Sequence, residues 1–170
     1  MAKTFTEPVV SDDELLRLSE RNPGYRIERD DDGEVTVSPS HTETGPKNGE
    51  AIGQLWQFAK TAGGKAYDSD TGFKTPRGGI LAPDASWISA ERLASLTPQQ
   101  RTKYWRVTPD VVIEVMSGSD SWSKLQKKID RFFEDGAAYA VAIHPHKRDV
   151  YERGTPPPGL ELDFNAIIDA

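Results

Sequence analysis

The sequence contains no cysteine among its 170 residues. This absence excludes disulfide bonds, thiolate zinc sites and every mechanism that uses a cysteine nucleophile. No apolar stretch approaches the roughly 20 residues that a membrane-spanning helix needs, so no membrane span is expected. The segment 1–7 also lacks the apolar core of a signal peptide, and a cytoplasmic location is therefore predicted.

Basic residues are also fewer than acidic ones. The chain has 21 Lys and Arg against 27 Asp and Glu, a net charge of −6. Proteins that bind nucleic acid non-specifically use Lys and Arg to neutralise phosphates, so this balance argues against a broad DNA-binding surface. A local basic surface beside a metal ion stays compatible with it, because part of the acidic count would then be metal ligands.

The length and a hydrophobic content of 36% suit a single domain, 1–170, with one hydrophobic core. Strand and helix patterns alternate, which predicts an α/β or α+β fold with its core in about 12–153 and a Pro-rich linker and tail over 154–170. The longer helices are expected over 11–20, 47–62 and 121–135, and strands over 25–29, 34–38, 65–75 in two pieces, 84–89, 110–116, 138–144 and 147–152. In the helix over 47–62, the spacing of Ile52, Leu55, Trp56 and Ala59 predicts one buried face.

The strand over 110–116 carries an acid, Glu114, inside an apolar run. Burying an unpaired charge costs several kcal/mol, so something must offset this carboxylate, and a divalent metal ion would do so. Asp110 shares its face of the strand but lies about 13 Å away, too far to hold the same ion. Asp84, on another strand, can approach Glu114 across a sheet. Two such carboxylates suit Mg²⁺ or Mn²⁺.

The helix over 121–135 follows this strand and carries three lysines. At about 100° per residue, Leu125, Ile129 and Phe132 belong to one apolar stripe. Lys127 projects opposite that stripe, whereas Lys128 flanks it and is best placed to reach Glu114. A metal ion lowers the pKa of a bound water, and a lysine can orient that water or stabilise transition-state charge. These groups together predict hydrolysis of a phosphodiester.

Six segments of the sequence, in the order in which they occur, are similar to those of a known protein family. They are Asn22–Glu28, Thr44–Asn48, Leu55–Trp56, Ala82–Ile88, Pro109–Ser117 and Leu125–Lys128. In order and spacing they resemble the Uma2 family of restriction endonucleases, within the PD-(D/E)XK nuclease superfamily. The resemblance extends from about residue 12 to residue 152. It implies a restriction-endonuclease-like fold, in which helices flank a mixed central β-sheet and the site lies at one edge.

The resemblance also implies an activity and its residues. The family match implies a Mg²⁺- or Mn²⁺-dependent DNA endonuclease that hydrolyses phosphodiester bonds. By position, Asp84 and Glu114 match the metal-binding acids, Glu28 matches an acid that completes the metal shell, and Lys128 matches a lysine on the following helix. A homodimer is expected by analogy alone, because restriction-type enzymes that cut both strands often pair two subunits.

One residue departs from the superfamily pattern. That pattern places a lysine two residues after the second acid, where this chain has Met116. Either Lys128 replaces that lysine from the helix, or the protein is a catalytically inactive nuclease fold that serves as a binding or interaction module. In the second case the corresponding role of Glu114 is a structural ion pair with Lys128. Hydrolysis of a phosphate ester outside nucleic acids is a third alternative.

Overall fold

The computed structural model describes residues 10–39, 42–118 and 120–170. Segment 1–7, on which the targeting prediction depends, lies outside them. The described helices are α1 (Asp12–Arg21), α2 (Gly45–Ala62), α3 (Ala90–Ser95), α4 (Trp122–Glu134) and α5 (Phe164–Asp169), with 3-10 helices η1 (Pro98–Arg101) and η2 (Pro145–Lys147). The strands are β1 (Tyr25–Arg29), β2 (Val35–Pro39), β3 (Lys65–Asp68), β4 (Phe73–Lys74), β5 (Ile80–Leu81), β6 (Ala85–Ile88), β7 (Val111–Val115), β8 (Tyr139–His144) and β9 (Asp149–Gly154).

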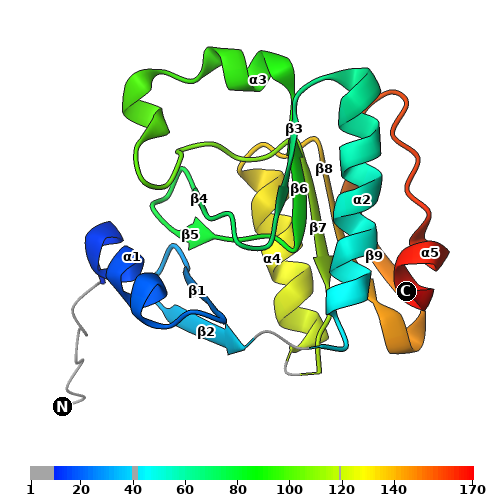
Figure 1. Cartoon of the computed structure of the whole chain (residues 1–170), viewed down its shortest axis with the longest axis horizontal. Coiled ribbons are helices and arrows are strands. Elements are labelled where there is room, and N and C mark those ends of the chain that lie inside the picture. Colours follow the sequence, from blue (N-terminus) through cyan, green and yellow to red (C-terminus); the bar gives the residue numbers. More distant parts are fainter. Residues whose placement is uncertain (1–9, 40–41, 119) are drawn as a thin grey trace.

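The larger sheet has the strand order β3-β6-β7-β8-β9 (Figure 1). Strands β7 and β8 run parallel, and α4 connects them, as parallel neighbours require a crossover. The other neighbours in this sheet are antiparallel. The sheet is therefore mixed and carries helices on both faces, which confirms the predicted fold class.

The alternation of β7 divides the core into two layers. Val111, Ile113 and Val115 pack with buried residues of α2 on one face. Val112 packs with Leu125 and Ile129 of α4 on the other face. Glu114 has the same parity as Val112, so its carboxylate lies on the α4 side of the sheet, where only 1% of the residue is exposed.

The predicted hairpin belongs to a second, smaller sheet rather than to the central one. Its order is β2-β1-β5-β4, with antiparallel pairs throughout. Helix α1 begins with a capping box between Ser11 and Glu14, and its Leu15 packs against Ile27 of β1. This packing presents the residues of β1 to the edge of the larger sheet.

Asp31, in the hairpin turn, contacts both the β4–β5 turn and helix α4. Its Oδ1 accepts hydrogen bonds from the Thr75 hydroxyl at 2.6 Å and from the Gly79 N–H at 3.1 Å. Its Oδ2 lies 3.1 Å from Nε of Arg131 on α4. One buried carboxylate thus holds the hairpin tip against both the β4–β5 turn and α4.

Two details differ from the sequence-based expectations. Trp56 was expected on the buried face of α2, but it is 54% exposed and Lys60 Nζ lies 3.5 Å from its ring centroid. The buried positions of α2 are Ala51, Leu55 and Phe58. The tail after the Pro-rich segment places Leu160 and Ile167–Ile168 in the larger core beside α2. None of the helices in the described ranges is long and apolar enough to cross a membrane.

Candidate active site

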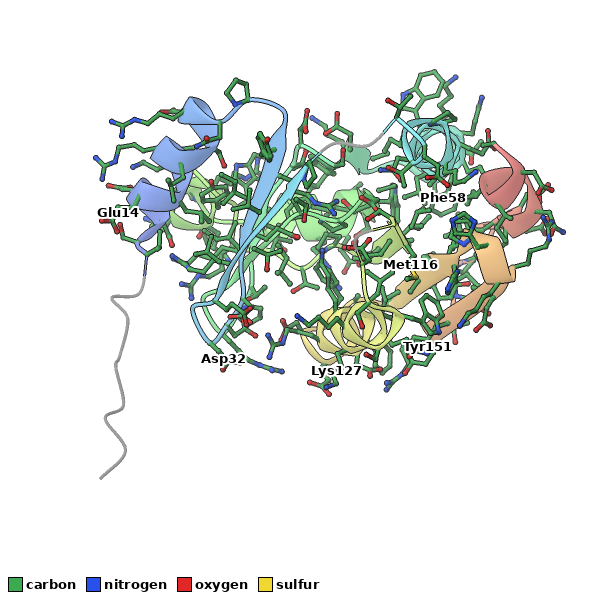
Figure 2. All side chains as sticks on the ribbon, turned by 90° about the horizontal axis from the view of Figure 1, so that it is seen from below. Glu14, Asp32, Phe58, Met116, Lys127 and Tyr151 are labelled. Carbon is green, nitrogen blue, oxygen red and sulfur yellow. The ribbon has the colours of Figure 1, made fainter. Side chains whose placement is uncertain are left out.

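Five charged side chains from four parts of the chain meet where the two sheets approach each other. Arg26 and Glu28 come from β1, Asp84 directly precedes β6, Glu114 lies in β7 and Lys128 lies in α4. We call these five residues the charged cluster. Figure 2 shows the β1–β2 hairpin, whose tip lies near Asp32, next to helix α4, which carries Lys127.

Lys128 connects two acids of the cluster that belong to different sheets. Its Nζ lies 2.9 Å from Glu28 Oε1 and 2.7 Å from Glu114 Oε1. The contact with Glu28 is a hydrogen bond. The contact with Glu114 is an ion pair outside hydrogen-bond geometry, because Glu114 Oε1 has no hydrogen-bond partner among the described residues. The side chain that the helix periodicity singled out therefore does reach the acid of β7.

Asp84 is held by three donors. Its Oδ2 accepts a hydrogen bond from the backbone N–H of Val115, 2.7 Å away, which ties it to the strand of Glu114. Its Oδ1 accepts hydrogen bonds from Arg26 at 2.5 Å and from the Asn48 amide at 3.3 Å. Both oxygens of Asp84 are thus occupied by groups of the protein itself.

Burial and the neighbouring charges set the protonation of the cluster. Burial raises the pKa of Glu114 to about 8; Lys128 opposes this shift, and the nearby Asp84 adds to it. Burial also acts to raise the pKa of Glu28, but Lys128 and Arg26 outweigh it and the pKa is lowered. For Lys128, burial acts to lower the pKa, yet Glu114 and Glu28 raise it. Near neutral pH, below the raised pKa of Glu114, the cluster therefore holds a charged lysine and a mostly protonated Glu114.

Two hollows open onto the cluster and meet at Arg26. The larger, of about 860 Å³, lies between the β1–β2 hairpin and α4, and we call it the hairpin groove. Glu28, Glu114 and Lys128 line it. The smaller, of about 340 Å³, lies at the first turn of α2, and we call it the α2 pocket; Asp84 lines it. Arg26 lines both hollows and contacts one acid of each, Asp84 at 2.5 Å and Glu28 at 3.7 Å.

Arg26 and Asn48 are cluster contacts that the sequence analysis did not identify. A signal for Arg26 exists, because it lies two residues before Glu28 and so shares its face of β1. Asn48 offers a weaker one, as a polar residue in the first turn of a helix. Asp110 lies apart from the cluster and pairs with Arg92, 3.0 Å away. Met116 packs in the α4 core layer.

The donor set of the cluster fits a hard divalent cation. Three carboxylates, from Glu28, Asp84 and Glu114, supply the oxygen ligands that Mg²⁺ and Mn²⁺ prefer. One of these oxygens, Glu114 Oε1, is buried and lies 2.7 Å from the Lys128 ammonium. As arranged, though, no three Asp, Glu or His side chains of the described ranges lie close enough to hold an ion together. Arg26 and Lys128 each contact two of the acids instead.

Comparison with known proteins places this site in a family. A solved structure described as a putative nuclease belonging to DUF820, from Anabaena variabilis ATCC 29413, matches with a TM-score of 0.69 over 92% of this chain and 96% of that chain. The two sequences are 17% identical, so the likeness shows the fold. No curated protein matches the sequence. The model of the Uma2 family, described as putative restriction endonuclease, matches residues 12–156. Since this match covers most of the chain and all five residues of the charged cluster, the protein belongs to the Uma2 family.

Proposed function

We propose that the protein is a nuclease, and specifically a Mg²⁺- or Mn²⁺-dependent DNA endonuclease that hydrolyses phosphodiester bonds. The observation that carries this proposal is the meeting of three carboxylates and one lysine where the hairpin groove and the α2 pocket adjoin. Burying four ionisable side chains together is costly for stability, so a site of this kind points to a chemical role. The family description and the name of the matched nuclease point in the same direction.

The three acids divide into two roles. Asp84 and Glu114 would hold the metal ion, because the hydrogen bond from Val115 already fixes the Asp84 carboxylate beside the strand of Glu114. Glu28 would complete the shell from the smaller sheet. When bound, the ion would polarise a phosphoryl oxygen and lower the pKa of a bound water.

Lys128 supplies the positive charge of the reaction. The two acids beside it keep its ammonium group protonated, so it can stabilise charge on a phosphate or orient the attacking water. It does so from α4, since Met116, directly after β7, has no charge to offer. Lys124, Lys127 and Arg131 line the same wall of the hairpin groove and would attract the phosphates of a DNA strand.

The hydrogen bonds and ion pairs within the cluster also favour a second candidate function. Arg26 and the Val115 N–H occupy both oxygens of Asp84, and Lys128 joins Glu28 to Glu114. A network of this kind also suits a catalytically inactive nuclease fold that acts as a binding or interaction module.

A homodimer is proposed for either function by analogy with restriction enzymes, and light scattering of the protein in solution tests it.

The deciding assay is cleavage of supercoiled plasmid, linear duplex and single-stranded DNA with Mg²⁺ or Mn²⁺. Asp84→Asn keeps the size of the side chain and removes a charged ligand, so we expect activity to fall by about 100-fold or more. Asp149→Asn, at an exposed aspartate of β9 outside both hollows, is the matched control and should retain most activity. A wild-type rate no higher than that of Asp84→Asn on all substrates would overturn the catalytic proposal in favour of the binding module.

A further inference from the structure

Arg26 occupies the position where a metal ion would have to approach Asp84. Its guanidinium donates a hydrogen bond to Asp84 Oδ1 at 2.5 Å, and its Nε lies 3.7 Å from Glu28 Oε2. The same side chain lies between the hairpin groove and the α2 pocket. It therefore supplies positive charge to two of the three acids that the proposed function assigns to the metal, one in each hollow.

The charges of the cluster show why this position matters. Three carboxylates face two protein cations, Arg26 and Lys128, so full ionisation leaves a net charge of −1. Adding a divalent ion to that set would leave a net charge of +1 in a partly buried site, where like charges repel strongly. If Arg26 moved away, the same ion and Lys128 would balance the three acids. Metal binding is therefore favoured by the departure of Arg26.

The contacts around Arg26 are also incomplete. Its own Nε and the Oδ1 of Asn48 are buried, and neither has a hydrogen-bond partner within the described ranges. Leaving a buried polar atom unpaired costs about 1–3 kcal/mol, so this arrangement is less stable than a fully bonded one. The Arg26 side chain is 23% exposed and borders two hollows, so it has space to turn without displacing the core.

We propose that Arg26 is a positioning residue that competes with the metal ion for Asp84. In the metal-free protein it neutralises Asp84 from a position beside both hollows. Asp84 and Glu114 would hold a divalent ion only after the guanidinium has left Asp84. This inference rests on the proposed metal-dependent function, and it adds that the chain carries its own competitor for the metal.

Calorimetric titration of the DNA-free protein with Mn²⁺ tests this competition without relying on activity. Arg26→Met removes the guanidinium and should bind Mn²⁺ about tenfold more tightly or better, a factor that corresponds to about 1.4 kcal/mol. Arg26→Gln provides a second neutral variant if the methionine variant does not fold. Arg106→Met is the matched control: it removes an exposed guanidinium outside both hollows, and its Mn²⁺ affinity should stay close to that of the wild type.

The outcomes separate this inference from the proposed function. Tighter binding by the Arg26 variants alone supports the competition. If the wild type binds Mn²⁺ and the Arg26 variants bind it equally or more weakly, the competition is refuted and the metal site stands. An equal gain in Arg106→Met would also refute it, since any lost cation would then have the same effect. If neither the wild type nor the Arg26 variants bind Mn²⁺ better than Asp84→Asn, both the competition and the metal-dependent function are refuted.

Discussion

The ammonium group of Lys128 lies 2.7 Å from the carboxylate of Glu114, an acid in the middle of the apolar strand β7. Lys128 comes from the helix that follows the strand, and the same ammonium also bonds Glu28 on the smaller sheet. This pairing explains how the strand tolerates a buried carboxylate. It also places a cation beside the acids without a lysine on the strand itself.

Replacing Lys128 by Met should destabilise the metal-free protein by about 3 kcal/mol, because it leaves two buried acids facing Arg26 alone. Denaturant unfolding in EDTA measures this change. Lys127→Met is the matched control on the exposed side of α4, and its effect should stay within about 0.5 kcal/mol. Equal stability of the two variants would show that the pairing of Lys128 with Glu114 does not contribute to the free energy of unfolding.

The raised pKa of Glu114 predicts a particular dependence of stability on pH. From its ordinary value of 4.5 up to about 8, the folded protein keeps a proton on Glu114 that the unfolded chain has already released. The free energy of unfolding should therefore fall as pH rises through this window and level off above it.

Glu114→Gln carries no such proton, so its stability should fall less between pH 5 and pH 8.5 than that of the wild type does. Thermal unfolding of both proteins in EDTA across these pH values measures the difference. The lowered pKa of Glu28 acts in the opposite direction, but both proteins share Glu28 and its contribution is largely removed by the comparison. Parallel profiles for the two proteins would contradict the shift assigned to Glu114.

The turn residue Asp31 should affect the site although it lies at the tip of the hairpin. Asp31→Ala removes the acceptor for Thr75 and Gly79 and leaves Arg131 without its acid, which should cost about 2 kcal/mol. The loosened hairpin carries Glu28, so Mn²⁺ affinity should fall as well. Asp32→Ala, at an exposed position of the same turn, should leave both quantities nearly unchanged. Unfolding and calorimetry on the two variants decide this.

Two aromatic residues of α2 test which face of that helix is buried. Phe58→Ala should cost about 3–5 kcal/mol, because Phe58 is buried against the edge of the Trp87 ring. Trp56→Ala should cost less than about 1 kcal/mol, since it removes only an exposed ring and its contact with Lys60. Denaturant midpoints compare the pair directly, and a larger loss for Trp56 would reverse the assignment.

The sequence predicts those parts of the fold that depend on local periodicity. The alternation of β7 and the apolar stripe of α4 place Glu114 and Lys128 on facing surfaces, and the structure has them in contact. The same helical spacing fits two stripes through Leu55, one with Ile52, Trp56 and Ala59 and the other with Ala51 and Phe58. The structure buries the second stripe and leaves Trp56 exposed.

The contact between Arg26 and Asp84 lies beyond such local patterns. The two residues are 58 positions apart, and their meeting depends on how the smaller sheet packs against the edge of the larger one. The hairpin itself was predicted from its alternation, but nothing in that alternation indicates which sheet it joins. The site residues matched by family position are therefore easier to predict than the protein cation that occupies the space between them.

If the proposed function holds, Asp84 and Glu114 bind one divalent metal ion together. Anomalous diffraction from a crystal soaked in Mn²⁺ would locate such an ion. We expect a peak in contact with both carboxylates, with the Arg26 guanidinium displaced from Asp84. An anomalous map without a peak at these two acids, with Arg26 still bonded to Asp84 at saturating Mn²⁺, would contradict it.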